Sequence, residues 1–478
     1  MASLIALHVE LEDVDPPITR DLLVDGSLSL ADLHCALQIA FGWRDYHAHM
    51  FTQVDQPGPG PGTRIWSDPA VVLGPDVAPE SEAIIAEVLA GGPLAYDYDF
   101  GDCWRHRITA AAPTSAIGAH RLVALVAGSR RGPFEDAGGP AGYAEKLAVL
   151  ADPEDPDHAG IADWAAEMIG PWFPPAPETC DVASIQAELD DFFGYGADHR
   201  DPGDMSGLVL ADDVRDPGDL QPDALLADFA AGLPVFARSE FRQYVRRTGL
   251  LEPVTPSAEV RAQLTAPFAW LLEAVGPEGL ALSKAGWLPP AVVLDGMTSL
   301  GWHEPRIGSS TREQSTPPLA ALREAATRLG LVRVLKGRLV RTGHGNRAAA
   351  GPDALWDSLV ARILERLSPG AQVAGTALLL TYADGRPPAG LPDRTWRDVA
   401  FVLEVCGWAP SGPSDEFDWG SISAITRPVE TVLDCLGSTQ GKTGWPPHRG
   451  RDPHLADFAR AVLHGPAAIR SATVSRHR

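Results

Sequence analysis

The sequence is poor in cysteine and has no long apolar run. Its 478 residues include five cysteines, which are scattered and never arranged as a CxxC pair. Such a set argues against a disulfide framework or a closed zinc knuckle, and it predicts a reducing, cytoplasmic compartment. No apolar run reaches the roughly 18 residues that span a bilayer. We therefore expect no membrane partner.

Signal-peptide features and strong ligand motifs are missing too. The first residues, MASLIALHVELEDVD, have neither a basic n-region nor a small-residue cleavage site, so they predict a first strand. No HExxH or comparable motif marks a catalytic centre. For this reason the sequence names no substrate and no reaction, and it leaves open whether the protein is an enzyme.

Positive charge is scarce in the N-terminal part of the chain. Residues 1–200 hold 32 acidic and 10 basic side chains, whereas residues 201–478 hold 31 and 29, and the whole chain has a net charge of −24. The first part would repel a phosphate backbone, which excludes it as a nucleic-acid-binding surface. Residues 311–350 differ, because eight Arg or Lys side chains there accompany only two Glu.

The patterns that are present predict an α+β fold for residues 1–195. The strand LIALHVEL alternates apolar residues onto one face, and LADLHCALQIAF has helical spacing between Ser29 as N-cap and Gly42 as stop. Further strands and helices come after these without βαβ alternation. Gly-, Pro- and Asp-rich residues 196–223 predict a linker. Helical patterns beyond it predict a winged-helix-like domain and a second helical domain, at 224–370 and 371–478.

The stretch YDYDFGDCWRH, residues 96–106, holds the candidate catalytic residues. On an extended strand its aspartates and aromatics point to opposite faces, and Gly101 permits a bend that redirects the residues after it. Asp99, Asp102 and His106 could then converge as a set for general acid–base catalysis. The alternative is a structural corner, in which Asp102 caps a turn and His106 is a packed core residue.

Two histidines upstream extend this hypothesis. DYHAHMF places His47 and His49 two apart, so on a strand they share a face. If that strand pairs with the one at 96–106, imidazoles and carboxylates meet, which suits a divalent metal with mixed nitrogen and oxygen ligands. The candidate metal ligands are His47, His49, Asp102 and His106. The candidate small-ligand pocket is lined by His34, His47, His49, Tyr98 and Trp104. A packed core histidine is the competing interpretation for His34.

These stretches also occur in an order that is typical of one family. They are VELEDVDPPITRDLLV, LSLADLHCALQIAFGWRDYHAHMF, YDYDFGDCWRHRI and FEDAGGPAGYAEKLAVLADPEDPDH. Over roughly residues 1–195 the chain resembles the plasmid pRiA4b ORF-3-like family, named for a plasmid open reading frame and also met in insertion elements. The resemblance implies a compact α/β-roll domain, often cytoplasmic, with no established biochemical activity.

The chain keeps the polar residues of this family's motifs and departs from it elsewhere. Thr19 and Asp21 replace a usual Trp and Arg, and Gly132 stands where the family has a cysteine, which argues against an essential thiol. The matching positions are Leu33, His34, Gln38, Gly42, Trp43, His47 and His49, then Tyr98, Asp99, Phe100, Gly101, Asp102, Trp104 and His106, then Glu135, Asp136, Gly138, Gly139, Gly142 and Tyr143.

The basic segment 311–350 has the element order of a winged helix. LVRV and RLVR around Lys336-Gly337 predict a β-hairpin after three helical stretches. In winged-helix DNA binders the third helix and the hairpin meet the groove and the phosphates. The candidate nucleic-acid contacts are Arg323, Arg328, Arg333, Lys336, Arg338 and Arg341. The competing interpretation is a protein-interaction module whose arginines are solvated or paired with acidic groups.

Together these features predict a cytoplasmic accessory or binding protein associated with mobile elements. Its N-terminal domain would bind an unknown protein or a small ligand in a pocket of histidines and aspartates. A metal-dependent or acid–base enzyme using the same pocket is one alternative. A regulator that contacts DNA through residues 311–350 is the other.

Overall fold

The structure is a computed structural model of the chain. It describes residues 4–54, 64–71, 77–111, 121–172, 175–193, 225–233, 235–250, 252, 254–302, 312–384, 392–410, 417–436 and 453–465. Within these residues no helix combines the length and the apolar character needed to cross a membrane.

The chain divides into two compact units. The first comprises Met1–Gly218 and Pro234–Tyr244, and the second comprises Asp219–Leu233 and Val245–Arg478. The predicted linker, 196–223, lies outside the described residues. The predicted boundary at residue 370 falls at the start of a helix, α13 (Pro369–Ala383), and the division of the helical region into two domains stays a prediction.

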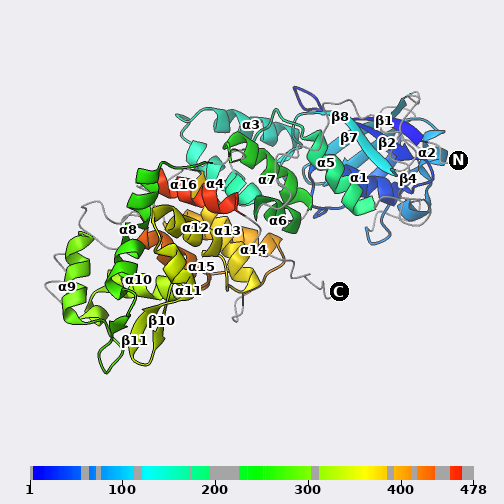
Figure 1. The fold of residues 1–478 in the computed structure, drawn as a ribbon. Helices are drawn as coiled ribbons and strands as arrows, with labels where there is room; N and C mark the ends of the chain where they lie inside the picture. The colour runs from blue at the N-terminus through cyan, green and yellow to red at the C-terminus, as the bar shows by residue number, and fades with distance from the viewer. Residues whose placement is uncertain are drawn as a thin grey trace, which may run out of the picture. The chain divides into compact units, whose positions relative to one another are not determined.

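An eight-stranded sheet organises the first unit (Figure 1). Its strand order is β5-β4-β3-β6-β7-β1-β2-β8, and every neighbouring pair is antiparallel except β4 and β5. The strands are β1 (Leu4–Leu11), β2 (Ile18–Asp25), β3 (His49–Gln53), β4 (Ile65–Ser67), β5 (Val77–Pro79), β6 (Leu94–Tyr98), β7 (Trp104–Ala111) and β8 (Val123–Ser129).

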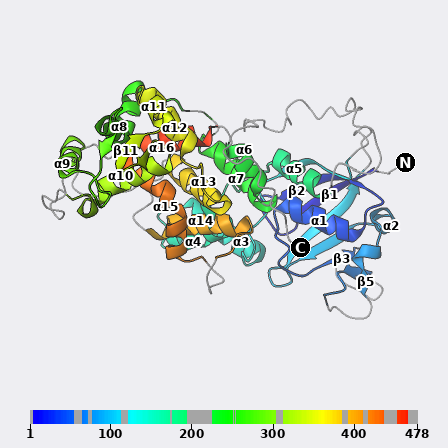
Figure 2. The same ribbon diagram turned by 60° about the horizontal axis from the view of Figure 1, so that its bottom comes forward.

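The helix α1 (Leu30–Phe41) covers one face of this sheet, as Figure 2 shows. The Ser29 hydroxyl accepts from the Asp32 N–H, and the Asp32 carboxylate accepts from the Ser29 N–H, which is a capping box. The helix ends at Gly42, whose φ of 77° is in the left-handed region. Both predicted ends of this helix are confirmed.

Register places two rows of rings across the sheet on the face that α1 covers. His49 lies opposite Tyr98, which lies opposite Trp104, and in the next row Tyr96 lies between Phe51 and His106. Because directly paired residues project to the same face, these side chains form a continuous aromatic layer. This layer and the apolar side chains of α1 make up the centre of the core.

The corner between β6 and β7 differs from the predicted alternation. Asp97 stays on the strand and faces Arg105 at 3.7 Å, away from the tyrosines. Asp99 comes directly after the strand with a φ of 55°, and its Oδ1 accepts from the Gly101 N–H at 2.9 Å. The left-handed conformation turns the Asp99 side chain to the face of Tyr98, so the two aspartates do not share a face.

Short helices complete the first unit. The helix α5 packs along β8, where the Gln186 side chain accepts from the Leu125 N–H at 2.7 Å. The elements are η1 (Glu80–Glu82), α2 (Ile85–Leu89), α3 (Gly139–Ala151), α4 (His158–Ile169), η2 (Gly170–Trp172), α5 (Val182–Phe193) and α7 (Val235–Arg247), most of which belongs to this unit.

After its first helix, the second unit has the element order helix, strand, helix, 3-10 turn, helix, hairpin. Its elements are α6 (Leu225–Gly232), α8 (Ala258–Val275), β9 (Leu280–Ala281), α9 (Pro290–Ser299), η3 (Glu313–Ser315), α10 (Pro317–Arg328), β10 (Val332–Leu335) and β11 (Arg338–Arg341). The strand order is β10-β11-β9. Lys336 and Gly337 turn the hairpin with φ values of 49° and 74°, as a type I′ turn requires. The hairpin is confirmed, and its identification as a winged helix stays a prediction.

Further helices fill the rest of this unit. They are α11 (Gly343–Ala348), α12 (Pro352–Arg362), α13, α14 (Pro392–Val405), α15 (Trp419–Cys435) and α16 (Pro453–Leu463). The largely apolar α13 packs against α14, α15 and α16 and is buried along most of its length. A sheet domain before a mostly helical region is an α+β chain, so the predicted fold class is confirmed.

Candidate functional site

Pairing of β3 with β6 brings the two candidate segments together. His49 lies opposite Tyr98, and the Asp99 N–H donates to the Ala48 carbonyl at 3.0 Å. His47 and His49 nevertheless enter two different groups of side chains. We call these the imidazole stack, which consists of His34, Asp45, His49 and Glu80, and the carboxylate cluster, which consists of His47, Asp99, Glu135 and Asp136.

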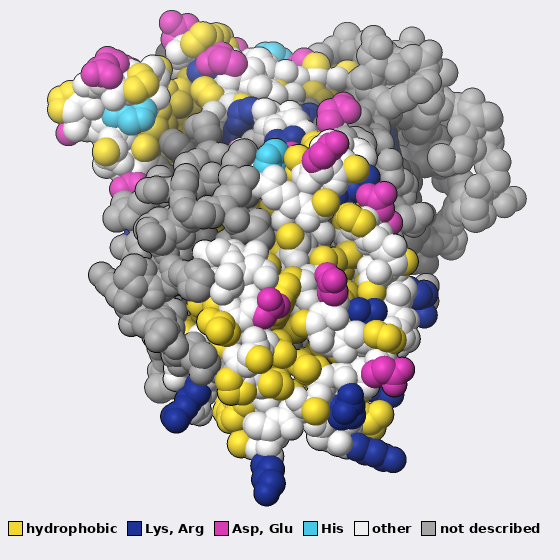
Figure 3. Space-filling model, turned by 60° about the vertical axis from the view of Figure 1, so that its left-hand side comes forward, with side chains coloured by type: hydrophobic (Ala, Val, Ile, Leu, Met, Phe, Trp, Pro, Cys, Tyr) yellow, Lys and Arg dark blue, Asp and Glu magenta, His cyan; other side chains and the backbone are white. Residues whose placement is uncertain are grey.

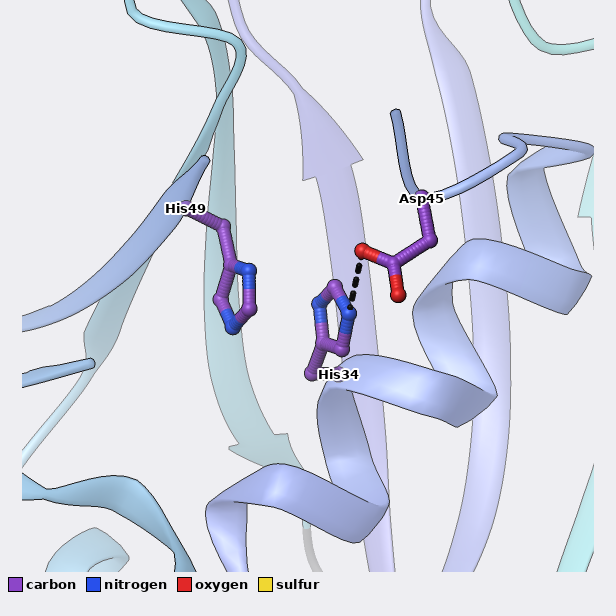
Figure 4. Close-up of side chains that lie close together, drawn as sticks. All are labelled: His34, Asp45 and His49. Atoms are coloured by element: carbon purple, nitrogen blue, oxygen red, sulfur yellow. Dashed lines mark hydrogen bonds and ion pairs between the residues drawn. The ribbon is translucent and has the colours of Figure 1, made fainter. Parts of the chain in front are cut away.

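In the imidazole stack two histidines lie face to face (Figure 4). The rings of His34 and His49 have centroids 3.6 Å apart and planes that differ by 6°. Both side chains are buried, whereas Asp45 is exposed in the loop between α1 and β3. The Asp45 Oδ1 lies 3.1 Å from the His34 Nε2. Each of these three residues offers one ligand atom, and the three atoms lie within 4.8 Å of one another.

The outer nitrogens of both rings already have partners. The His49 Nε2 lies 2.8 Å from the buried carboxylate of Glu80. The His34 Nδ1 lies 2.9 Å from the Tyr96 hydroxyl, which also accepts from the Gln38 amide at 2.9 Å. Figure 4 shows the second ring nitrogen of His49 on the side that faces His34 and Asp45. The stack therefore has oriented rings and an inward-facing nitrogen on each.

Burial keeps His34 in the form that binds metals. Burial, and to a smaller extent the neighbouring His49, lower the pKa of His34 from 6.5 to about 4. A neutral imidazole has a lone pair available for a metal, and an imidazolium has none. At neutral pH His34 is thus a competent ligand.

The carboxylate cluster surrounds the other histidine. The His47 Nε2 lies 3.6 Å from the Asp99 Oδ2, 3.7 Å from the Glu135 Oε2 and 3.4 Å from the Asp136 Oδ1. These distances are too long for good hydrogen bonds, and this buried nitrogen has no hydrogen-bond partner among the described residues. The side chains of Asp99 and Glu135 are only 9% and 5% exposed, and that of Asp136 is 62% exposed.

The buried carboxylates of this cluster are held mainly through one oxygen each. The Glu135 Oε1 accepts from the Arg44 N–H at 2.7 Å and from the Tyr98 hydroxyl at 3.0 Å. The Asp99 Oδ1 accepts main-chain N–H groups of the corner after β6. Burial raises the pKa of Glu135, although the Arg44 N–H and the Tyr98 hydroxyl act in the opposite direction. The second oxygen of each carboxylate faces the imidazole.

His106 and Asp102 lie outside both groups. The His106 Nδ1 faces the carbonyls of Tyr96 and Trp104 at 3.2 and 3.1 Å, and the ring packs edge-on against Phe41 in the core. Burial lowers the pKa of His106 to about 4. The Asp102 Oδ2 accepts from the Gly138 N–H at 2.8 Å, at the start of α3. Of the predicted catalytic set, only Asp99 meets an imidazole, and that imidazole belongs to His47.

Trp104 and Tyr98, which were predicted to line one pocket, lie in different surroundings. Trp104 is fully buried against Trp43, with ring centroids 5.5 Å apart, and belongs to the core rather than to a pocket wall. Tyr98 touches the carboxylate cluster through its hydroxyl. Of the remaining predicted pocket residues, His34 and His49 belong to the stack, and His47 to the carboxylate cluster.

Sequence patterns missed four members of these groups. Asp45 and Glu80 come from a loop and a single 3-10 turn, where no periodicity indicates direction. Glu135 and Asp136 were visible only as a family motif before a glycine-rich turn. Asp136 has a φ of 53°, a conformation that aspartate adopts more readily than most residues. An acidic pair directly before such a turn was therefore the available signal.

Most of the predicted nucleic-acid contacts point inward. The Arg323 guanidinium lies 2.7 Å from the fully buried carboxylate of Glu313. Arg328 donates to the carbonyls of Ile363 and Pro428 at 2.9 and 2.8 Å, and burial lowers its pKa to about 10. Arg338 donates to the carbonyls of Glu278 and Gly279, and Arg341 to that of Leu272. These four arginines hold the unit together.

Arg333 and Lys336 differ from these four. Both are exposed on the hairpin, as is Arg338, and they lie next to the exposed apolar side chains Val334 and Leu335. The face of the molecule drawn in Figure 3 has apolar side chains on its lower part, and Lys and Arg side chains project at its lower rim. The outward-facing positive charge of the predicted set is therefore concentrated on the hairpin.

Comparison with known proteins places the first unit in a family. Residues 3–183 match the family described as plasmid pRiA4b ORF-3-like protein. The uncharacterized protein y4hQ of Sinorhizobium fredii is 35% identical over 165 residues, which are 34% of this chain and 81% of that protein. The chain belongs to the pRiA4b ORF-3-like family. The imidazole stack and the carboxylate cluster both lie inside the family region.

A solved structure also resembles part of the chain. It is a protein of unknown function, MM3350, from Methanosarcina mazei, with 26% identity. The match covers 37% of this chain and 95% of that protein, with a TM-score of 0.31.

Proposed function

We propose that the N-terminal unit binds a divalent transition-metal ion at His34, Asp45 and His49, and that the protein is a metal-binding accessory protein of its family. One observation carries this proposal. The His34 Nε2 lies 3.1 Å from the Asp45 carboxylate, a ligand atom of His49 lies within 4.8 Å of those of the other two residues, and the outer ring nitrogens are held by Tyr96 and Glu80. A hydrogen-bonded outer nitrogen that fixes the tautomer is the usual support of a metal-bound histidine.

The ligand set favours particular metals. Two imidazoles and one carboxylate suit Zn²⁺ and Fe²⁺, and three protein ligands leave coordination positions open for water or a small ligand. A metal in such a site polarises a bound ligand or lowers the pKa of bound water. Binding also requires one ring to rotate out of the stack, because parallel rings 3.6 Å apart cannot both direct a lone pair at one ion.

Titration of full-length, chelator-treated protein with Zn²⁺ tests the proposal. We expect each of three variants to bind one equivalent of Zn²⁺ fewer than the unmodified protein, or to bind that equivalent at least about 10-fold more weakly. The variants are His34→Gln, His49→Gln and Asp45→Asn. The matched control is His8→Gln, because His8 pairs with Asp21 at 2.6 Å on the surface. Unchanged Zn²⁺ stoichiometry and affinity in folded stack variants would refute the site.

We also propose a second candidate function, contact with nucleic acid, which the hairpin favours. The hairpin of β10 and β11 after helices α8, α9 and α10, together with the exposed charges of Arg333 and Lys336, supports a winged-helix-like contact with phosphates. Binding to duplex DNA is measured over a range of salt concentrations. Arg333→Ala with Lys336→Ala is expected to lower the salt slope by about two. A slope that does not change removes this candidate.

A further inference from the structure

We propose that the carboxylate cluster is a second cation site, independent of the first, which selects a harder ion such as Mn²⁺. Ligand atoms of His47, Asp99 and Asp136 lie within 4.8 Å of one another, and the Glu135 carboxylate adjoins them next to His47. The three carboxylate oxygens lie 3.4 to 3.7 Å from the His47 Nε2. Three carboxylates with a single imidazole form an oxygen-rich set, whereas the stack is nitrogen-rich, so the two sites differ in metal preference.

Electrostatics favour a bound cation at this place. Asp99 and Glu135 are buried on either side of the same imidazole nitrogen, and Asp136 adds a third carboxylate. A protonated His47 would supply one positive charge against three negative ones. The Arg44 guanidinium, from the neighbouring loop, donates to the Met168 carbonyl and also lowers the pKa of Glu135, so it offsets part of this negative charge. A cation bound among these carboxylates would balance their negative charge.

The carboxylate oxygens that face His47 are also pre-oriented, although the Glu135 Oε2 lies 3.3 Å from the Tyr98 hydroxyl, which donates to it. Asp99 accepts the corner N–H groups through Oδ1, and Glu135 accepts the Arg44 N–H through Oε1. The opposite oxygens, Oδ2 and Oε2, remain directed at the His47 Nε2, which has no hydrogen-bond partner among the described residues. An unsatisfied buried nitrogen is costly, and a metal ion would satisfy it together with both oxygens.

Two tyrosines of β6 place the sites side by side. Tyr96 holds His34 of the first site, and Tyr98 holds Glu135 of the second. The two rings are nearly parallel, with planes that differ by 11° and centroids 6.5 Å apart. Because residues two apart on a strand share a face, one strand supports both sites.

Binding of Mn²⁺ to full-length, chelator-treated protein tests this inference. Electron paramagnetic resonance reports free Mn²⁺ directly. We expect one tightly bound Mn²⁺ in the unmodified protein and a dissociation constant raised about 10- to 100-fold in Asp99→Asn and Glu135→Gln. Asparagine keeps the accepting Oδ1 and tolerates the left-handed backbone at position 99. Asp136→Asn changes an exposed residue, so it is expected to weaken Mn²⁺ binding with little effect on folding.

The controls separate this site from the first. Asp97→Asn makes the same chemical change two residues away on the opposite face, and it is expected to leave Mn²⁺ binding unchanged. His34→Gln is expected to keep Mn²⁺ binding while it loses Zn²⁺. The inference is overturned if the unmodified protein binds no Mn²⁺, or if Asp99→Asn, Glu135→Gln and Asp136→Asn all bind it as tightly as the unmodified protein.

Discussion

The candidate site residues of the two units differ in the partners of their charged groups. In the first unit, histidines and carboxylates face one another around shared points, and tyrosine hydroxyls hold them there. In the second, arginines that resemble a nucleic-acid-binding surface in the sequence donate to main-chain carbonyls and to one buried carboxylate. A cluster of like residue types therefore says little about function until the partners of its polar atoms are known.

The largest expected effect comes from the buried ion pair of the second unit. Glu313→Ala removes the carboxylate partner of the Arg323 guanidinium, which still donates to the Gly286 carbonyl, and leaves the Leu288 N–H without its acceptor. We expect a loss of about 3 to 5 kcal/mol in the free energy of unfolding. Scanning calorimetry measures it, and Glu324→Ala on the exposed side of α10 is the control. Equal stability of both variants would contradict a structural role for this charge.

Acid should destabilise the first unit through His106, one of its buried histidines. Burial lowers the pKa of His106 from 6.5 to about 4, so the unfolded chain binds the proton more tightly. The stability is fully present above pH 6.5 and is lost as the pH falls through about 4, by about 3 kcal/mol. Unfolding in denaturant at several pH values measures this. His106→Gln is expected to flatten the dependence, and an unchanged slope would contradict it.

In the second unit, replacing an arginine that has inward partners should cost more stability than replacing an exposed one. Arg328→Ala removes two hydrogen bonds to carbonyls and is expected to cost about 2 kcal/mol. Arg333→Ala, on the exposed hairpin, is expected to change stability by less than about 0.5 kcal/mol. Thermal unfolding of the two variants side by side measures the difference. Similar losses would show that the hairpin charge is structural too.

The smallest effects should come from the two tyrosines of the first unit. Tyr96→Phe removes the hydroxyl that holds His34, and Tyr98→Phe removes the one that holds Glu135. We expect the first change to weaken Zn²⁺ binding and the second to weaken Mn²⁺ binding, each about 10-fold. Calorimetric titration with both ions checks this. A loss of both ions in either variant would argue against two independent sites.

The sequence predicted elements whose signals are local. Ser29 and Gly42 determine the ends of α1, and the Lys336-Gly337 turn determines the hairpin, because capping and turn chemistry depend on a few adjacent residues. The hypothesis also depended on pairing of the strand after His47 with the strand at 96–98, and β3 does pair with β6. Strand alternation failed as a guide at Asp99, where a left-handed backbone turns the side chain to the other face.

The partners in the candidate sites could not be predicted in the same way. Asp45 and Glu80 approach the histidines from a loop and a single turn, so only tertiary packing determines their distance. His106 looked like a catalytic residue, yet its pairing opposite Tyr96 directs it into the core beneath α1. Its chemistry depends on burial, and no short sequence pattern reports burial.

The most direct test is an anomalous diffraction measurement on crystals of the protein soaked in Zn²⁺. The account predicts a zinc peak about 2.0 to 2.2 Å from the His34 Nε2, the inward-facing nitrogen of His49 and a carboxylate oxygen of Asp45, with the two rings no longer parallel. An intact stack with no anomalous peak beside it, in crystals where zinc binds elsewhere, would contradict the metal site.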